Sequence, residues 1–302
     1  MTPGSLSQAG ETANRRVVSW RYTRWGRFLM EPAAVFGSVI LVTLIIAAIA
    51  APILAPHDPI ETSLKLRNVP PFWDVKGSTD YLLGTDPVGR DLLSRIIYGA
   101  RVSLFVGIIV TLLAAVLGVG VGLVAGYYGG LIDEVLMRIA DLFLVFPFIL
   151  LAVTIIAVLG AGITNLIITL VITGWVQYAR LVRSQVLSLK AVQYVDAARV
   201  AGAKDARIIG RHILPNLLAS VVVLGTLQMA FVLLTEAALS FLGLGVNPST
   251  PTWGTMINEG RNYIYNAWWV ITFPGIAILL TVLAINMIGD WLRDVLDPTL
   301  RT

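Results

Sequence analysis

The sequence predicts an all-α, polytopic membrane protein with six transmembrane helices. Composition gives the first reason, because 57% of the 302 residues are hydrophobic and 13% are charged, whereas soluble domains carry about 25% charged residues. The second reason is the length of the uncharged runs, several of which exceed the roughly 20 residues that cross a bilayer as a helix. The solvent for most of this chain is therefore lipid.

The uncharged runs place the helices along the chain. They extend over Pro32 to Pro56, Val102 to Ile132, Leu142 to Ala179, Ile213 to Thr235 and Asn262 to Gly289. The third run is long enough for two helices, and Gly160-Ala161-Gly162 offers a tight turn between them. We therefore predict spans at about 33–55, 102–125, 138–159, 163–185, 214–241 and 267–289.

The N-terminal tail, residues 1–31, carries five arginines before the first span. A secretory signal has an apolar core of only about 7–15 residues, so the longer run after Glu31 predicts a retained helix behind a cytoplasmic tail. Six spans put both termini, the turn 126–137 and the loop 186–213 on one side. The other side holds seven of the 22 Lys and Arg residues, in agreement with the positive-inside rule. The basic character of the chain therefore predicts no nucleic-acid partner.

Motifs that indicate chemistry in soluble proteins have the wrong context here. Gly120-x-Gly122-x-x-Ala125 matches a loose dinucleotide pattern, but that pattern needs a preceding strand and this one lies within a predicted span. The chain has no phosphate-binding G-x-x-x-x-G-K-[ST] sequence and no cysteine. Its two histidines, His57 and His212, lie on opposite sides of the membrane by this topology. We expect no catalytic residues and no metal site.

Two other glycine- or charge-rich segments favour structural roles. Gly118, Gly122 and Gly126, at four-residue spacing, predict a small-residue face for close helix packing. The segment 84–101, GTDPVGRDLLSRIIYGAR, predicts an ordered turn followed by an amphipathic helix that leads into the second span.

A few residues inside the spans are candidates for gating or for the transport pathway. Glu236 lies 23 residues beyond Ile213, roughly 35 Å along a helix, which places it near the outer interface. Intramembrane charges are functional candidates by default, so Glu236 and Asp141 belong to this group. Pro147 and Pro274 fall inside the third and sixth spans, where a proline kinks a helix or serves packing alone.

The charged insertion between the fourth and fifth spans has a helical pattern. One apolar face is formed by Ala191, Val195 and Ala198, and a second by Ala206, Ile209 and Ile213. Gly202 between them fits the left-handed position that ends a helix, and Pro215 restrains the entry into the fifth span. The pattern predicts two short helices that dock onto a partner. A lipid-surface helix is the alternative, but the insertion lacks the Trp and Phe that such a helix would bury.

The stretch 196–215, DAARVAGAKDARIIGRHILP, resembles the EAA motif of ABC-importer permeases, E-A-A-x3-G-x9-I-x-L-P. Asp196 takes the place of the glutamate and His212 that of the isoleucine, two departures associated with the peptide branch of the superfamily. The matching residues are Ala197, Ala198, Gly202, Leu214 and Pro215.

The resemblance extends from about Trp25 onward. LLGTDPVGRDLLSRIIYGARVSL is similar to the family's first outer loop, LSFLGLGVNPSTPTWGTM to its last outer loop, and GDWLRDVLDP to its C-terminal signature. Trp291 and Val295 stand where smaller residues are usual. Together these motifs resemble the second, C-type permease of dipeptide/oligopeptide/nickel importers.

The resemblance implies a type I ABC-importer permease fold over 32–302. It places the first outer loop at 57–101, the cytoplasmic coupling loop at 187–215 and the last outer loop at 243–266. It also implies a multi-pass protein of the bacterial cytoplasmic (inner) membrane with both termini in the cytoplasm. The coupling loop would dock onto an ATPase through Tyr194, Val195, Asp196, Ala197, Ala198, Arg199, Gly202, Ala203, Asp205, His212, Leu214 and Pro215.

The implied partners are a second, homologous permease that forms a heterodimer with this chain, two ABC ATPase subunits and an extracytoplasmic substrate-binding protein. ATP and Mg would bind the ATPases, and this chain would bind no cofactor and catalyse no reaction. The expected cargo is di- or oligopeptides, with a nickel complex, glutathione or another small solute as alternatives.

Two other classes of function require features of their own. A secondary transporter or channel needs buried ion-coupling charges near the bilayer midplane, and only Arg138 and Asp141, near the inner end of the third span, come close. An intramembrane enzyme needs a catalytic pair or metal cluster at one depth, which the sequence does not offer. The predicted function remains the one that the resemblance implies, an ATP-driven importer permease.

Overall fold

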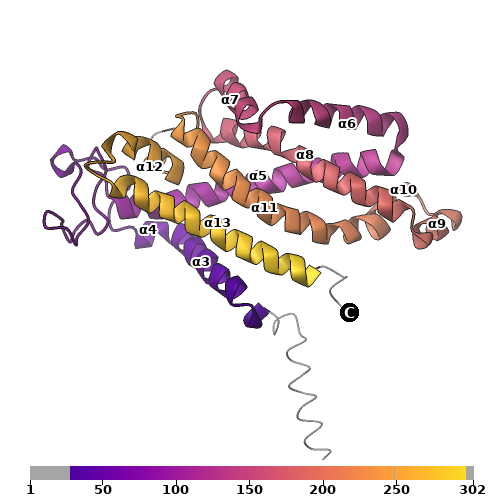
Figure 1. The fold of residues 1–302 in the computed structure, drawn as a ribbon, viewed down its shortest axis with the longest axis horizontal. Helices are drawn as coiled ribbons and strands as arrows, with labels where there is room; N and C mark the ends of the chain where they lie inside the picture. The colour runs from indigo at the N-terminus through magenta and orange to yellow at the C-terminus, as the bar shows by residue number, and fades with distance from the viewer. Residues whose placement is uncertain (1–27, 248, 297–302) are drawn as a thin grey trace, which may run out of the picture.

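The computed structural model describes residues 28–247 and 249–296, and these form an elongated bundle of helices (Figure 1). Most of the predicted N-terminal tail, residues 1–27, and the end of the C-terminal motif lie outside the described residues. Five helices are long and apolar enough to cross a membrane, or six if one bent pair counts as a single span. The predicted all-α membrane fold is confirmed within the described ranges.

The centre of the bundle is the contact between α5 (Leu92–Tyr128) and α8 (Ile163–Lys190). Three glycines of α5 make this contact close: a Cβ on Gly122 would lie 2.5 Å from the Ala179 carbonyl oxygen, and one on Gly126 would lie 2.8 Å from Val186 Cβ. Gly118 similarly abuts Trp175 and Tyr178 of α8. The absence of side chains on one helix face lets two backbones approach in lipid.

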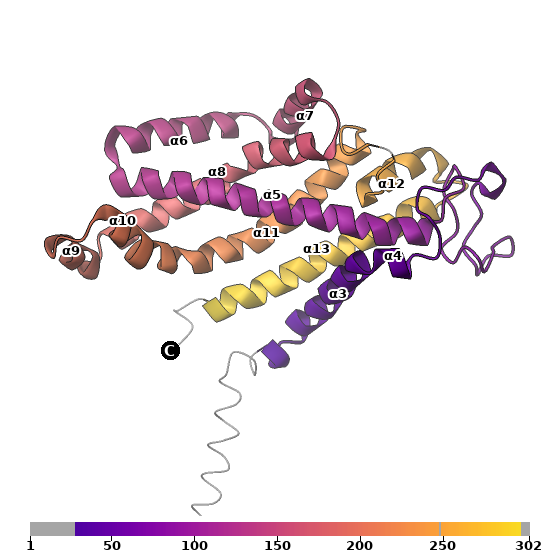
Figure 2. The ribbon, with the colours of Figure 1, turned by 180° about the vertical axis from the view of Figure 1, so that it is seen from behind.

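Three further helices flank this pair. α3 (Pro32–Ile49), followed by the short α4 (Ala51–Leu54), packs against α13 (Trp269–Leu296), and α13 packs against α11 (Leu214–Phe241). Figure 2 shows α13 lying between α11 and α3. Ala34 and Ala51 are fully buried in this layer, since small residues allow close packing here too.

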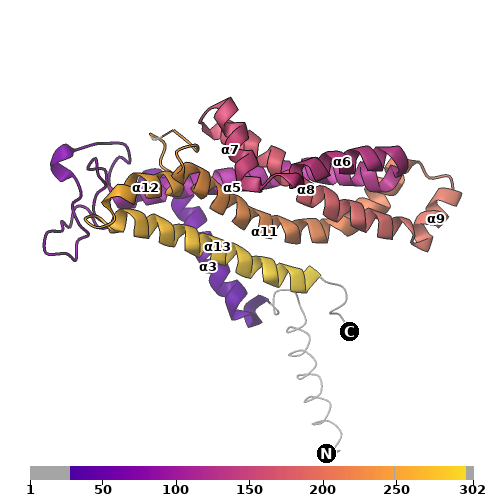
Figure 3. The same ribbon diagram turned by 45° about the horizontal axis from the view of Figure 1, so that its top comes forward.

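The predicted third span, 138–159, is found as a pair of helices bent at Pro147, one of the two prolines at which the sequence allows a kink. The chain forms α6 (Gly130–Val145) and α7 (Phe148–Leu159), which meet at 93°, and Figure 3 shows α7 turning away from α6. Phe146 has an extended conformation, φ −87° and ψ 137°, because a following proline disfavours the α region. Pro147 therefore ends one helix and begins another.

The predicted turn 126–137 is also too long, whereas the turn at 160–162 is confirmed. α5 continues to Tyr128, and α6 begins at Gly130. Gly129 and Gly130 both have positive φ, +67° and +55°, a conformation that glycine adopts without steric cost, and so reverse the chain in very few residues. Gly160 and Gly162 also have positive φ between α7 and α8.

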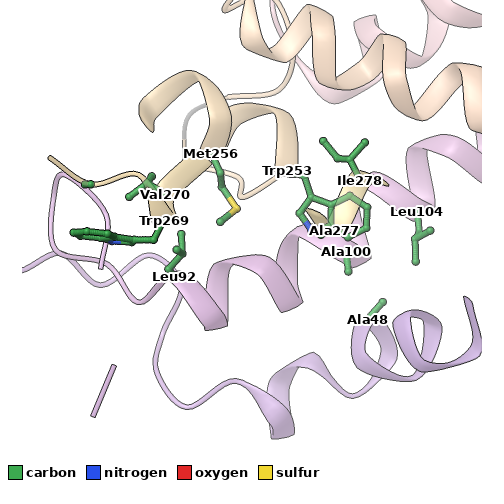
Figure 4. Close-up of a cluster of buried hydrophobic side chains, with 11 residues drawn as sticks. Ala48, Leu92, Ala100, Leu104, Trp253, Met256, Trp269, Val270, Ala277 and Ile278 are labelled. Carbon is green, nitrogen blue, oxygen red and sulfur yellow. The ribbon is translucent and has the colours of Figure 1, made fainter. Parts of the chain in front are cut away.

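One end of the bundle is covered by residues 55–91 and α12 (Trp253–Gly260), which we call the cap. The cap includes the single turn η1 (Leu64–Leu66) and is followed by η3 (Arg261–Tyr263). Its hydrophobic core lies between α5, α12 and α13, around Trp253 and Met256 (Figure 4). The buried indoles are held by hydrogen bonds: Trp253 Nε1 donates to the Ile96 carbonyl (3.1 Å) and Trp269 Nε1 to that of Thr85 (3.0 Å).

The opposite end of the bundle carries α9 (Gln193–Val200), the turn 201–204 and α10 (Asp205–Ile208), which together we call the tip. Figure 1 shows the tip projecting beyond the end of α8, far from the cap. α10 continues through a π-helical turn, η2 (Ile209–Ile213), into α11, with Pro215 in the first turn of that helix. The second short helix is thus an extension of the fifth span.

Candidate functional site

The turn at the centre of the tip is a Schellman motif. Gly202 has φ +77°, its N–H donates to the Arg199 carbonyl (3.0 Å), and the Ala203 N–H donates to the Ala198 carbonyl (3.0 Å). This pair of hydrogen bonds satisfies carbonyls that the end of α9 would leave open, and it requires a left-handed residue at the position of Gly202. The predicted helix end at Gly202 is confirmed.

The tip is anchored by three aliphatic side chains that are fully buried. Val195, Ile208 and Ile213 pack in one cluster with Val182 and Val186 of α8. Ala198 and Ala203 are partly buried against the same cluster.

Two residues that were predicted to lie on the apolar faces, Ala191 and Ala206, are exposed. Ala191 is exposed at the end of α8, before α9 begins, and Ala206 is exposed while Ile208 is buried. Ile208 packs against Val182 and Val186 of α8, so the position of α8 sets which face of α10 is buried, and the larger side chain there buries more apolar area.

The outer surface of the tip is apolar and small at its apex. Val200 is 90% exposed, and Ala197, Ala201 and Gly202 are also exposed. A Cβ on Gly202 would meet no atom within 4 Å. The apex is therefore a small apolar knob with open space around Gly202.

Polar groups surround this apex. Asp196 and Arg199 form an ion pair (3.0 Å) within α9, and both are exposed. Tyr194 is exposed and lies beside His212, with ring centroids 6.1 Å apart. Leu214 is half-buried and Pro215 exposed at the start of α11. The sequence-predicted residues thus divide between the tip, which holds those from Tyr194 to Asp205, and the segment that leads into α11, which holds His212, Leu214 and Pro215.

Hydrogen bonds that the sequence did not indicate tie the tip to α5 and α8. The Tyr127 hydroxyl at the end of α5 donates to Asp205 Oδ1 of α10 (2.6 Å). Lys190 Nζ at the end of α8 donates to the Tyr127 carbonyl (2.5 Å). The three helices α5, α8 and α10 therefore share one polar junction. Its only trace in the sequence is a tyrosine pair directly before the Gly129-Gly130 turn.

The four candidates for gating or the pathway lie in different surroundings. Glu236 is 1% exposed in α11 and accepts hydrogen bonds from Ser240 Oγ (2.8 Å) and from Ser103 Oγ of α5 (3.3 Å). Asp141 pairs with Arg180, and both side chains are about half exposed. Pro147 lies in the bend between α6 and α7, and Pro274 is buried within α13. Glu236 is thus a buried, fully engaged link between α5 and α11.

The cap contains a network of buried charges that joins two distant parts of the chain. Asp86 Oδ2 accepts from Arg90 Nε (2.6 Å) and Arg95 Nη1 (2.9 Å). Arg90 Nη2 and Arg95 Nη2 both donate to Glu259 Oε2 of α12 (2.7 and 2.8 Å). Burial raises the pKa of Glu259 to about 7, while Arg90 acts to lower this pKa and Asp86 adds to the rise. The predicted ordered turn and following helix are found, but the partner in α12 could not be foreseen.

A groove of about 890 Å³ runs along α8, α11 and α13 on the tip side of the bundle. Its polar lining comes from side chains on all three helices: Ser184, Gln185, Ser188, Asn216, Ser220 and Arg293. Polar side chains in membrane-spanning helices usually face protein or a water-filled cavity. The rest of the lining is apolar, from Leu181, Leu189, Pro215, Ala219, Val223, Leu224, Leu227 and Leu296, so the groove is amphipathic.

Comparisons with known proteins agree with this architecture. Residues 118–302 match the family described as binding-protein-dependent transport system inner membrane component, and residues 19–71 match the N-terminal TM domain of oligopeptide transport permease C. In the solved inward-facing MetNI methionine ABC transporter, one chain has a TM-score of 0.56 at 20% identity, over 68% of this chain and 98% of that one. This likeness shows the fold alone.

Curated relatives cover nearly the whole chain. The di/tripeptide transport system permease protein DppC of Pseudomonas aeruginosa is 43% identical over 92% of this chain and 91% of its own length. The dipeptide permease DppC of Bacillus subtilis is 40% identical over 98% and 91%, and the glutathione permease GsiD of Pectobacterium atrosepticum 42% identical over 92% and 91%. The chain therefore belongs to the binding-protein-dependent transport system inner membrane components, as a C-type permease subunit of an ABC importer.

Proposed function

We propose that this permease carries di- or oligopeptides across the bacterial cytoplasmic membrane, with the tip in the cytoplasm and the cap outside. The names of its relatives support this cargo, and the glutathione relative supports a short peptide-like solute as the alternative. A nickel complex is a weaker alternative, since the sequence has neither cysteine nor a histidine cluster that would suit such a metal.

The observation that carries the proposal is the shape of the tip. The tip is an exposed apolar knob that is anchored by Val195 and Ile208 and joined to two long helices. A docked protein that moves would therefore displace these helices. ATP and Mg would bind two partner ATPases, and this chain would bind no cofactor of its own. ATPase closure must favour one permease conformation over another for ATP to drive transport. The tip would transmit that preference to α8 and α11.

A second, homologous permease would complete the pathway as a heterodimer, and an extracytoplasmic binding protein would deliver the peptide at the cap. The amphipathic groove on α8, α11 and α13 would form this chain's half of the pathway. Its hydroxyl and amide groups suit peptide backbones, because N–H and C=O groups are present in every peptide whatever its side chains.

The test is a matched pair of glycine substitutions in the assembled transporter, reconstituted in vesicles with the binding protein. Gly202→Val places a β-branched residue at φ +77°, where it is strained. Gly210→Val is the control, because Gly210 also has open space around it but has a negative φ. We expect Gly202→Val to abolish ATP-driven dipeptide uptake while insertion and expression persist, and Gly210→Val to retain most uptake. Normal uptake by Gly202→Val at normal expression would contradict the docking role.

Cargo is tested in the same vesicles by competition. Unlabelled dipeptide, tripeptide, glutathione and a nickel chelate are compared as inhibitors of labelled-dipeptide uptake. We expect the peptides to compete and the chelate to leave uptake unchanged. Strong competition by the chelate alone would replace the peptide assignment without affecting the role of the tip.

A further inference from the structure

The cap end of the bundle presents a group of aromatic rings on its surface. Phe72, Trp73, Trp268 and Phe273, which we call the aromatic lip, lie next to one another. Ring centroids are 5.2 Å apart for Phe72 and Trp73, 6.0 Å for Trp73 and Phe273, and 5.9 Å for Trp268 and Phe273. The first three rings are each about half exposed. Residues from the first outer loop and from the start of α13 thus form one exposed aromatic surface.

The loop part of the lip is held in a fixed shape. Pro70 and Pro71 precede Phe72, the Asp74 N–H donates to the Pro71 carbonyl (2.9 Å), and the Gly77 N–H donates to the Asp74 carbonyl (2.9 Å). The Asp74 side chain accepts from the Lys76 N–H (3.0 Å). These turns leave Val75 fully exposed at their apex. An ordered turn that exposes Phe, Trp and Val loses little entropy when that surface is covered.

The tryptophans at the cap end of the bundle fall into two kinds. Trp253 and Trp269 are buried, and their indole N–H groups donate to backbone carbonyls. Trp73 and Trp268 are half exposed, and neither donates its indole N–H to an acceptor among the described residues. A tryptophan with an exposed apolar ring and an available N–H suits the membrane interface, where one end of the ring is apolar and the other is hydrated.

The lip continues the exposed apolar surface of a spanning helix. Trp268 directly precedes α13, and the exposed side chains of Ile276, Leu279 and Leu283 follow it on the same helical face. α13 has a mean hydropathy of 2.2 over its most apolar window. Trp73 meets Phe273 one turn inside this helix, so the loop reaches the level at which the span begins.

We propose that the aromatic lip and Val75 insert into the lipid headgroup region on the cap side and anchor the first outer loop to the bilayer. The rings would lie at the boundary between headgroups and acyl chains, with Asp74 and Lys76 among the headgroups. The first outer loop would then be a membrane-bound element that fixes the height of the cap above the bilayer.

Collision accessibility of a spin label tests the anchor, and the lack of cysteine in this chain makes single-site labelling direct. Val75→Cys is labelled with a nitroxide in the assembled transporter, with partner thiols removed, in phosphatidylcholine nanodiscs. Leu64→Cys is the control, because Leu64 is another exposed apolar residue of the cap, 79% exposed, and lies outside the lip. The ratio of accessibility to oxygen over accessibility to a water-soluble nickel chelate reports membrane depth.

We expect this ratio to be several-fold higher at 75 than at 64, and to fall toward the value at 64 when Phe72 and Trp73 are both replaced by Ser. A ratio at 75 equal to that at 64 in intact nanodiscs would show the lip in water and overturn the proposal. Low accessibility to both reagents at 75 would show a protein partner on the lip and would overturn it equally. Uptake measured on the labelled Val75→Cys transporter establishes that it is assembled.

Discussion

At the cap end of the bundle, Arg95 is 1% exposed and bridges Asp86 and Glu259, which are separated by most of the chain. At the tip end, Arg199 is 46% exposed and meets Asp196 within one helical turn. Both are arginine–carboxylate pairs with similar distances, 2.9 and 3.0 Å. The cap uses its charges to hold two distant segments together, whereas the ion pair of the tip remains exposed.

The difference follows from the cost of burying charge. A buried charge whose partner is removed costs about 3–5 kcal/mol, so the cap is committed to a single arrangement. An exposed pair contributes about 0–1 kcal/mol, so the ion pair between Arg199 and Asp196 adds little to the stability of the tip.

The largest expected effect comes from removing the buried arginine. Arg95→Ala leaves Asp86 and Glu259 facing each other with Arg90 alone, and we expect it to destabilise the cap by about 3–5 kcal/mol. The matched change at the tip, Arg199→Ala, should cost less than about 1 kcal/mol. Thermal unfolding of the two purified variants, with limited proteolysis of residues 55–91 as the local readout, makes the comparison. Equal losses at the two sites would remove the distinction between cap and tip.

The middle effect concerns α5, the helix that joins the two regions. Gly122→Ala would put a Cβ 2.5 Å from the Ala179 carbonyl oxygen and 2.8 Å from Val182 Cβ, and we expect a loss of about 1–3 kcal/mol from the forced separation of α5 and α8. Gly120→Ala is the control, because a Cβ there meets no atom within 4 Å. Unfolding in detergent with increasing denaturant measures both, and a Gly120→Ala variant as unstable as Gly122→Ala would argue against the packing face.

The smallest effect sharpens the description of the tip. Tyr127→Phe removes only the hydroxyl that donates to Asp205 (2.6 Å), and we expect about 1 kcal/mol less protection of α10 from amide hydrogen exchange. Tyr128→Phe is the control, because the neighbouring Tyr128 is half exposed and its hydroxyl makes no hydrogen bond with the described residues. If both variants leave exchange in α10 unchanged, the junction with α5 does not hold the tip.

Local signals in the sequence were sufficient for much of this architecture. Uncharged runs located the spans, and glycine spacing indicated the face of α5 that meets α8. Gly202 indicated the turn of the tip, because glycine adopts a positive φ without steric cost and this preference can be read from a single residue. The Phe146–Pro147 bend lay within a uniformly apolar run, where hydropathy carries no information on helix direction.

Long-range partners could not be predicted in the same way. Glu259 reaches Arg95 across 164 positions, and one sequence contains no signal for such a pair. The choice of Ile208 over Ala206 as the buried residue of α10 depends on where α8 lies. These features are set by tertiary packing, which overrides local periodicity.

Helix α5 has a mechanical consequence. It has 37 residues, about 55 Å at 1.5 Å per residue, while the hydrocarbon core of a bilayer is about 30 Å thick. Asp91, in the cap, is the N-cap residue of α5, and Tyr127, at the other end of the helix, donates a hydrogen bond to Asp205 of the tip. The helix is thus a stiff lever whose two arms emerge on opposite sides of the membrane. We expect a displacement of the tip by a few ångströms to be transmitted along α5 and to shift the cap as well.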